Sequence, residues 1–313
     1  MYVVTNRNLQ PNEPPENRFG KKFNEVDPSE LRLAEVDKVD GSWQLKILSD
    51  RETYEGQEIF ASEAAFLKTQ KRMCDNSTNC LVFCHGYNTD FKGALEAAWT
   101  IQEIYQDLEV VLFSWPSDGE QTSYRSDKRE ASQSVYALDR FFEKLDDYLK
   151  KYQDRHCGQK ISFAMHSMGA YLLEHLLKSS IYEGETLFFD NIIMMSADVN
   201  NQDHVDWVNR IKCRNRLFIT INEDDFALGF SELKGGDEQE ARLGNTARNL
   251  NSNNATYLNF TDAKFVGDAH NYFSKDEPLR NVKVKEIFQT AFNGGRAEQG
   301  LSFDVGTGAY KVT

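Results

Sequence analysis

The chain has 313 residues, a formal net charge of -13 and a hydrophobic fraction of 40%. This composition is typical of an ordinary globular protein with enough apolar residues for a large core. The negative charge argues against a nucleic-acid partner and against an anionic membrane surface, because both interactions depend on clustered Lys and Arg.

The first 80 residues predict antiparallel or edge strands. Residues 2–5 and 42–48 alternate between apolar and polar side chains, as strands with one exposed face do. Residues 8–16 are rich in Pro and Asn and predict a loop. A helix is expected around residues 63–73, just before the first buried strand.

From residue 81 onward, short apolar runs alternate with amphipathic stretches. The runs have β-branched or aromatic content, as strands buried on both faces do, and they are residues 81–84, 110–113, 161–164, 192–195 and 217–221. Between them, apolar residues recur at helical spacing, most clearly in 135–149 and 171–177. This alternation predicts an α/β fold with a mostly parallel central sheet and helices on both faces.

The simplest domain organisation is one domain over residues 1–293. Residues 1–80 would supply N-terminal strands and loops, and residues 81–293 the α/β core. The Gly-rich tail, residues 294–313, is either flexible or adds an edge strand through residues 309–312. Few residues separate the strands at 192–195 and 217–221, so no large cap domain is expected there.

A candidate nucleophile lies between a predicted strand and a predicted helix, in Met165-His166-Ser167-Met168-Gly169. A tight strand-to-helix turn would present the Ser167 hydroxyl beside the free N–H groups of the helix N-terminus, which favour negative charge. The other interpretation makes Ser167 a helix N-cap. Such turns usually have a small residue two positions before the serine, so Met165 implies a local adjustment or a wider turn.

The turn Cys84-His85-Gly86-Tyr87-Asn88 follows the earlier buried strand and predicts part of an oxyanion hole. Its donor would be the backbone N–H of Tyr87 or Asn88, with the N–H of Met168 as the second donor. Taken alone, the segment would be an ordinary Gly-containing turn.

Chain order identifies the base and restricts the acid. In enzymes whose nucleophilic serine lies on a strand-to-helix turn, the acid and then the histidine follow the serine in the chain. Of the six histidines, His270 alone follows the predicted strand at residues 255–260, in the place that this order requires. The acid would orient the imidazole and stabilise its charged form. Asp224 and Asp225 follow one strand and Asp198 another, and residue types alone leave all three open.

Two segments are expected to shape the substrate site. Residues 115–129 offer Trp115 and Tyr124 as substrate-binding side chains. Residues 229–254 are Gly-rich and charged, and they predict a mobile flap.

The motifs resemble a largely uncharacterised, mostly bacterial, esterase- or lipase-like branch of the α/β-hydrolase superfamily. The resemblance rests on a His-Gly-Tyr-Asn turn, a Phe-Ser-Trp-Pro-Ser segment, a His-Ser-Met-Gly elbow, an Asp-x-Ala-Leu motif and a late His-Asn-Tyr-Phe, which are residues 85–88, 113–117, 166–169, 225–228 and 270–273. The resemblance implies Asp225 as the acid of a Ser167–Asp225–His270 triad. Met165 departs from the Ala or Gly usual there.

The resemblance and the residues together predict a serine hydrolase that cleaves a carboxylic ester or thioester through an acyl-enzyme. Its substrate would be a small-molecule or lipid-like acyl compound, and no cofactor, metal or nucleic acid is expected. One alternative is a catalytically weak receptor or interaction module with the same fold. Another is an acyltransferase, and a third is metal-dependent chemistry using Cys84, His85 or His204. The oligomeric state stays open.

The compartment is predicted from the start of the chain and from the cysteines. The first residues lack a basic segment followed by an apolar one, and no apolar run is long enough to span a bilayer, so no integral membrane insertion is expected. The cysteines are odd in number and irregularly spaced, at positions 74, 80, 84, 157 and 213. Free thiols in a reducing cytoplasm are therefore expected.

Overall fold

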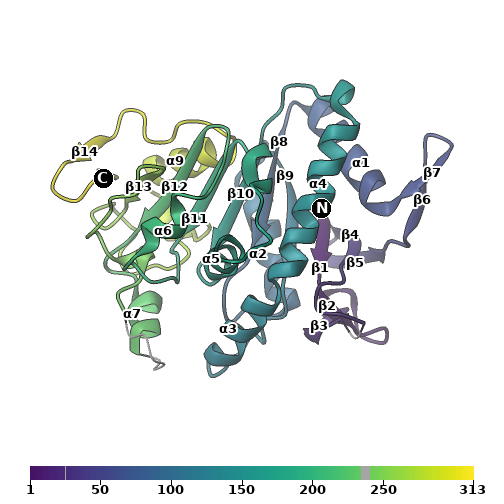
Figure 1. Ribbon diagram of the computed structural model, residues 1–313, viewed down its shortest axis with the longest axis horizontal. Helices are drawn as coiled ribbons and strands as arrows, with labels where there is room; N and C mark the ends of the chain where they lie inside the picture. The colour runs from purple at the N-terminus through teal and green to yellow at the C-terminus, as the bar shows by residue number, and fades with distance from the viewer. Residues whose placement is uncertain (25, 234–239) are drawn as a thin grey trace. The chain divides into compact units, whose positions relative to one another are not determined.

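The computed structural model describes residues 1–24, 26–233 and 240–313. The chain forms two compact units, Met1–Lys160 and Ile161–Thr313 (Figure 1). Residues 81–160 therefore belong to the same unit as residues 1–80, and the tail 294–313 belongs to the second unit.

The first unit contains a run of five sheet strands whose spatial order is β8, β9, β1, β4, β5. Their bounds are Asn79–Cys84 for β8, Leu108–Ser114 for β9, Tyr2–Thr5 for β1, Arg32–Val39 for β4 and Ser42–Ile47 for β5. The strands β8, β9 and β1 run parallel, whereas β4 is antiparallel to β1 and β5 to β4. Two small antiparallel pairs accompany them: β2 (Arg7–Leu9) with β3 (Phe19–Phe23), and β6 (Arg51–Tyr54) with β7 (Gln57–Phe60).

The expectation of an edge or antiparallel pairing for residues 2–5 is only half right. Strand β1 lies between two neighbours: Tyr2 pairs with Val111 in parallel β9 and with Glu35 in antiparallel β4. All four residues of β1 are buried. The predicted loop 8–16 is also partly wrong, because β2 continues to Leu9 and a 3-10 helix begins at Pro15.

Helices cover both faces of this part of the sheet. The helices are α1 (Ala61–Asn76), α2 (Phe91–Ile104), α3 (Tyr124–Gln133) and α4 (Val135–Lys151), and α1 confirms the helix expected at 63–73. Phe113 of β9, which shares a face with Val4, packs on Phe141 of α4 with ring centroids 5.9 Å apart. On the opposite face, Trp43 of β5 packs edge-on against Trp99 of α2 at 5.6 Å.

A disulfide joins Cys74 at the end of α1 to Cys157 in the segment after α4. The prediction that all cysteines are free thiols is therefore wrong for this pair, whereas Cys80, Cys84 and Cys213 are free. Spacing gave no signal because the two residues are 83 positions apart and meet only when α1 and α4 pack together. Disulfides persist in oxidising compartments, so the cysteines no longer support a cytoplasmic location.

The second unit continues the mostly parallel pattern. Its spatial strand order is β10, β11, β12, β13, β15, β14, with bounds Ile161–His166, Asn191–Met195, Arg216–Ile221, Ala255–Asn259, Ala309–Lys311 and Ser302–Asp304. All neighbours are parallel except β14 and β15. The strand expected in the tail is present as β15, but β14 covers its outer edge, so β15 is not an edge strand.

The second unit's helices include α5 (Gly169–Lys178), α6 (His204–Val208), α7 (Phe226–Leu233), α8 (Asp276–Leu279) and α9 (Val282–Phe292). Helix α9 contacts β10 and β11, and α5 contacts α6. The predicted α/β class with a mostly parallel sheet is confirmed. In the described ranges, every helix is too short or too polar to cross a bilayer.

Candidate active site

A sharp turn between β10 and α5 carries Ser167, whose φ of 52° is unusual for a residue with a side chain. Two backbone hydrogen bonds hold this conformation. The Ser167 N–H donates to the Met195 carbonyl at 2.9 Å, and the Asp198 N–H donates to the Ser167 carbonyl at 3.2 Å. The last residue of β11 and the segment that follows it therefore hold the turn from both sides.

Met165 fits this turn without breaking the sheet. Its side chain is completely buried, and the parallel register with β11 runs unbroken from Phe163 to His166, with Met165 opposite Met194. The large side chain lies in the apolar core, and Ser167 makes the sharp bend through its positive φ. The wider turn expected from Met165 is not required.

The N-terminus of α5 offers an amide to a developing negative charge. The Met168 carbonyl accepts from Tyr171 and Leu172, but in the described ranges the Met168 N–H donates no hydrogen bond. Unpaired N–H groups at the start of a helix favour anions. This geometry is what an oxyanion donor at Met168 needs.

His270 and Asp225 form a hydrogen-bonded pair. The His270 Nδ1 lies 2.8 Å from Asp225 Oδ2 and 3.0 Å from Oδ1. The Asp225 carboxylate is fully buried, and the His270 side chain is 18% exposed. Asp225 Oδ1 also accepts from the Leu228 N–H at 3.1 Å, so the carboxylate caps the start of α7 and is fixed in place.

The other acid candidates have different surroundings. Asp224 is exposed. Asp198 is buried and forms an ion pair with Arg242, whose Nε lies 3.2 Å from Asp198 Oδ1, and it accepts from the Ser231 hydroxyl. Of the three, the structure brings Asp225 to His270.

His270 lies beside the turn through its contact with His166, whose ring centroid is 4.5 Å from that of His270. Among the described residues, the hydroxyl of Ser167 donates no hydrogen bond to His270. Catalytic hydrogen bonds of this kind are often long before substrate binds and tighten in the reacting complex.

Sequence reasoning missed a second set of residues that holds His270. The Ser196 hydroxyl donates to the His270 carbonyl at 2.9 Å, and the Ser196 N–H donates to Thr220 Oγ1 at 3.3 Å. The Tyr272 hydroxyl bonds Thr220 Oγ1 at 2.5 Å. Since Ser196 directly follows Met195, one strand end contacts both the Ser167 turn and the His270 loop. No motif in the sequence indicated this role.

In the first unit, the amide of Asn88 donates to Asp127 Oδ2 at 3.2 Å. The prediction of Asn88 as an oxyanion donor is therefore wrong, because its N–H already has a carboxylate acceptor. The alternative donor, the N–H of Tyr87, stays a prediction.

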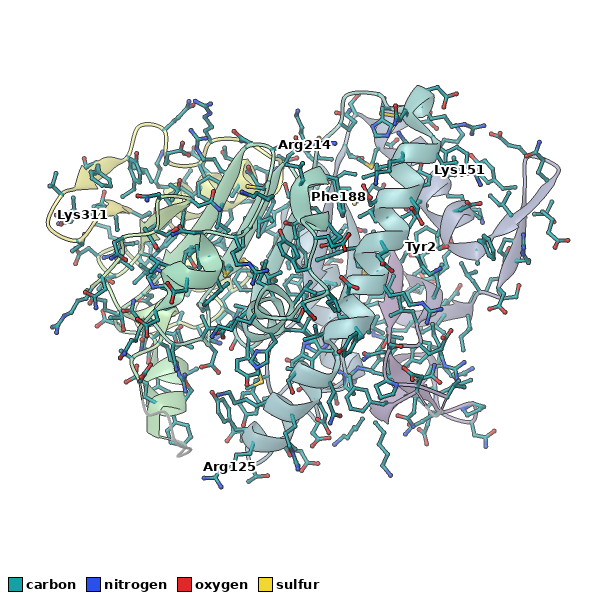
Figure 2. The ribbon with its side chains drawn as sticks, viewed as in Figure 1. Tyr2, Arg125, Lys151, Phe188, Arg214 and Lys311 are labelled. Atoms are coloured by element: carbon teal, nitrogen blue, oxygen red, sulfur yellow. A yellow bond between two sulfur atoms is a disulfide. The ribbon has the colours of Figure 1, made fainter. Side chains whose placement is uncertain are left out.

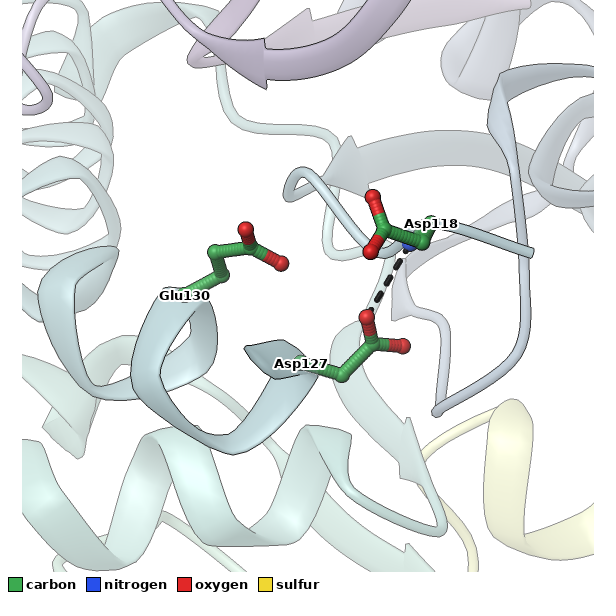
Figure 3. Close-up of side chains that lie close together, drawn as sticks. All are labelled: Asp118, Asp127 and Glu130. Atoms are coloured by element: carbon green, nitrogen blue, oxygen red, sulfur yellow. Dashed lines mark hydrogen bonds between the residues drawn. The ribbon is translucent and has the colours of Figure 1, made fainter. Parts of the chain in front are cut away.

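Asp127 belongs to a cluster with Asp118 and Glu130, whose carboxylate oxygens lie within 4.8 Å of one another (Figure 3). The Asp127 carboxylate accepts from the Ser117 hydroxyl at 2.5 Å and from the Asp118 N–H at 3.1 Å. Burial raises the pKa of Asp127, and burial and the two aspartates raise the pKa of Glu130 to about 7. Asp127 thus fixes the turn at Asn88 by hydrogen bonds.

The two predicted substrate-binding side chains are buried. Trp115 is fully buried, stacks on His85 with centroids 5.1 Å apart, and donates from Nε1 to the His85 carbonyl at 3.0 Å. Tyr124 is 7% exposed and packs edge-on against Tyr87 at 5.2 Å. The substrate-binding prediction is wrong for Trp115, because this side chain has no exposed surface, and it has no support at Tyr124, which is nearly as buried. The sequence pattern could not show this, because a local pattern does not report burial.

The candidates for metal chemistry have structural partners. Burial and Arg7 lower the pKa of His85 to about 3, and burial raises the pKa of the Cys84 thiol. His204 bonds the Asn201 carbonyl and the Tyr257 hydroxyl, both at 2.6 Å. The His85 Nδ1 also lies 2.9 Å from the Gly86 carbonyl, and the Cys84 thiol donates to the His85 carbonyl at 3.8 Å. These burials and contacts favour packing roles for all three residues.

The predicted flap, 229–254, falls partly outside the described residues, at 234–239. Its described part includes residues bonded to the segment after β11, since the Leu243 N–H donates to the Val199 carbonyl at 2.8 Å and the Gly244 N–H to the Ala197 carbonyl at 3.0 Å. A Cβ at Gly244 would lie 2.3 Å from the Ala197 nitrogen, so only glycine allows this approach. These contacts anchor residues 243 and 244, and the mobility expected for the rest of the flap stays a prediction.

Comparisons with known proteins agree with the fold. The family described as "Alpha/beta hydrolase of unknown function (DUF900)" matches residues 61–274. An uncharacterised protein of Nostoc sp. strain PCC 7120 is 27% identical, and the match covers 46% of this chain and 47% of that protein, so the chain spans about half the length of this relative.

Three solved structures are similar at low identity. Lipase B of Aspergillus fumigatus has a TM-score of 0.41 at 9% identity, over 71% of this chain and 55% of that one. A putative cell surface hydrolase of Lactobacillus plantarum has a TM-score of 0.37 at 8% identity, over 70% and 93%. A predicted CIB-like hydrolase of Thermoplasma acidophilum has a TM-score of 0.33 at 14% identity, over 81% and 96%. The family match spans more than half of the chain, and the chain therefore belongs to this family of α/β hydrolases of unknown function.

Proposed function

We propose that the protein is a serine hydrolase that cleaves a carboxylic ester or thioester through an acyl-enzyme, with Ser167, His270 and Asp225 as its triad. The observation that carries the proposal is the contact of the buried Asp225 carboxylate with His270 Nδ1. In addition, the His270 ring packs on His166, which directly precedes the strained Ser167. The expected substrate is a small-molecule or lipid-like acyl compound.

The Asp225 contact determines which ring nitrogen of His270 is able to accept a proton. A carboxylate at Nδ1 favours the tautomer with hydrogen on Nδ1, which leaves the Nε2 lone pair as the base. As the Ser167 hydroxyl attacks the acyl carbonyl, Nε2 takes its proton, and the carbonyl oxygen becomes an oxyanion. The Met168 N–H stabilises this oxyanion, and we propose the Tyr87 N–H as the second donor.

Collapse of the tetrahedral intermediate expels the alcohol or thiol, which receives the proton from His270. Water then attacks the acyl-enzyme while His270 again acts as the base, and the carboxylic acid and free Ser167 result. Each step uses side chains and backbone amides alone.

A fluorophosphonate probe tests the proposal directly, because such probes phosphonylate a serine only when it is activated. We expect a stoichiometric adduct on Ser167, located by peptide mass spectrometry, that is absent in Ser167→Ala and strongly slowed in His270→Ala. Ser302→Ala and His156→Ala are matched controls, since both residues are exposed and lie away from the turn in sequence. These controls should label at the wild-type rate.

A folded protein that gives no adduct on Ser167 would contradict the proposal and favour the interaction module. Equal loss of labelling in His156→Ala and His270→Ala would also contradict it, because only His270 contacts Asp225. A second arm adds hydroxylamine or an alcohol to an ester assay. Exclusive transfer to the added nucleophile in excess water would identify an acyltransferase.

A further inference from the structure

The first unit contains a cavity that none of the three proposed triad residues lines. The cavity measures about 640 Å³, inside the range of roughly 300–1,000 Å³ typical of small-molecule sites. All of its lining residues belong to the first unit, between Tyr2 of β1 and Lys144 of α4. Tyr2 is labelled in Figure 2, and α1 and α4 are drawn beside β1 and β4 in Figure 1.

The floor of the cavity is apolar. Val4, Leu33 and Val111 line it from three adjacent strands, and the pairings of Val4 with Leu33 and of Tyr2 with Val111 place these side chains on one face of the sheet. Phe66 of α1 and Phe141 of α4 form the walls and contact each other at 6.3 Å. The floor would cover the hydrocarbon part of a ligand, and its burial stabilises the complex in proportion to area.

The polar part of the lining carries three cations, Arg32, Arg140 and Lys144, and two carboxylates, Glu30 and Asp50. Arg140 Nη1 is paired with Glu30 at 2.8 Å. This positive bias is local, because the chain as a whole has a net charge of -13. A ligand with a negative head group therefore fits the charge of the site better than a neutral or cationic one.

Lys144 is the cation best placed to bind such a head group. It lies one helical turn after Arg140, so the two side chains share a face of α4. It is exposed, and in the described ranges no ion pair or hydrogen bond involves its ammonium. The lysine can reach a ligand without giving up a protein partner.

We propose that this cavity binds an amphipathic carboxylate, a molecule with an apolar body and one anionic head. The apolar body lies on the floor formed by Val4, Leu33 and Val111, and the carboxylate binds Lys144 and Arg140. The site is separate from the proposed triad and does not depend on it.

Calorimetric titration with decanoate below its critical micelle concentration tests the proposal. The protein for the titration carries Ser167→Ala, so that neither catalysis nor an acyl-enzyme contributes, and the result stands whether or not the triad is active. We expect saturable binding at one site per chain and weaker binding of 1-decanol, which has the same chain without charge, by about tenfold.

Two variants locate the site. Lys144→Glu should weaken decanoate binding by about tenfold or more through charge reversal, whereas Lys92→Glu, at an exposed lysine of α2 outside the cavity, should leave it unchanged. Ala65→Trp should fill the cavity and abolish binding of decanoate. If this variant does not unfold cooperatively, and is therefore not properly folded, the comparison of Lys144→Glu with Lys92→Glu is the test of the site.

Three results would overturn the proposal. The first is no saturable binding of decanoate, and the second is equal affinity for decanoate and 1-decanol. The third is equal binding by the Lys144→Glu and Lys92→Glu proteins, which would place the bound decanoate elsewhere.

Discussion

Replacing Asp225 by Asn tests the proposed mechanism most sharply, because the change keeps the shape and removes the charge. The Asn oxygen can still accept from the Leu228 N–H at the Oδ1 position, so the cap of α7 survives. The amide nitrogen then lies at the Oδ2 position, 2.8 Å from His270 Nδ1. Two N–H donors would face each other there, so the imidazole must take the other tautomer.

The size of the effect follows from that tautomer. With hydrogen on Nε2, His270 cannot accept the Ser167 proton, and Ser-His-Asp hydrolases lose about 10⁴-fold in kcat on this substitution. That loss corresponds to about 5.4 kcal/mol, at 1.36 kcal/mol per factor of ten. The free energy of unfolding should change by less than about 1 kcal/mol, because the helix cap is kept.

The readout is the second-order rate of fluorophosphonate labelling, followed where possible by hydrolysis of p-nitrophenyl esters of increasing chain length. Asp224→Asn is the matched control, since this neighbouring carboxylate is exposed. Thermal unfolding of both variants shows whether the fold is intact. Labelling of Asp225→Asn within tenfold of wild type, or an equal loss in Asp224→Asn, would refute the reasoning.

Three further predictions concern stability. Cys74→Ser should lower the free energy of unfolding by about 4 kcal/mol, since the disulfide to Cys157 closes a loop with a separation of 83 residues. Dithiothreitol should destabilise the wild type and leave the variant unchanged. A wild type that dithiothreitol does not destabilise would contradict this prediction. Arg242→Met leaves the buried Asp198 carboxylate without its cation and should lower the free energy of unfolding, measured in urea, by about 3–5 kcal/mol. A decrease below about 1 kcal/mol would contradict this prediction. Glu130 should make the free energy of unfolding fall as the pH rises from 4.5, its ordinary pKa, to about 7. The reason is that in this pH range the carboxyl keeps its proton in the folded state and loses it in the unfolded state. Glu130→Gln should flatten this part of the pH profile of the melting temperature, and an unchanged profile would contradict the raised pKa.

The sequence was sufficient for the parallel core and for the position of Ser167. Buried parallel strands are continuous apolar runs, and the alternation of such runs with helical periodicity specifies an α/β sheet locally. The turn after β10 is equally local, because the strand, the serine and the helix are adjacent in the chain. His270 followed from chain order, and the structure brings its Nδ1 to Asp225.

Residue types and spacing left Asp225 and its neighbour Asp224 open, and the family resemblance favoured Asp225. The tertiary structure brings the Asp225 carboxylate to His270 and leaves Asp224 exposed, because the two side chains leave the same loop in different directions. It also showed that the Asn88 amide has a carboxylate partner and that Trp115 has no exposed surface. The pairing of Cys74 with Cys157 depends on contacts between segments far apart in the chain. Sequence periodicity reports which residues are apolar and how regularly they recur. Which backbone amide, carboxylate or thiol meets a partner is decided by packing between distant segments, which no local pattern records.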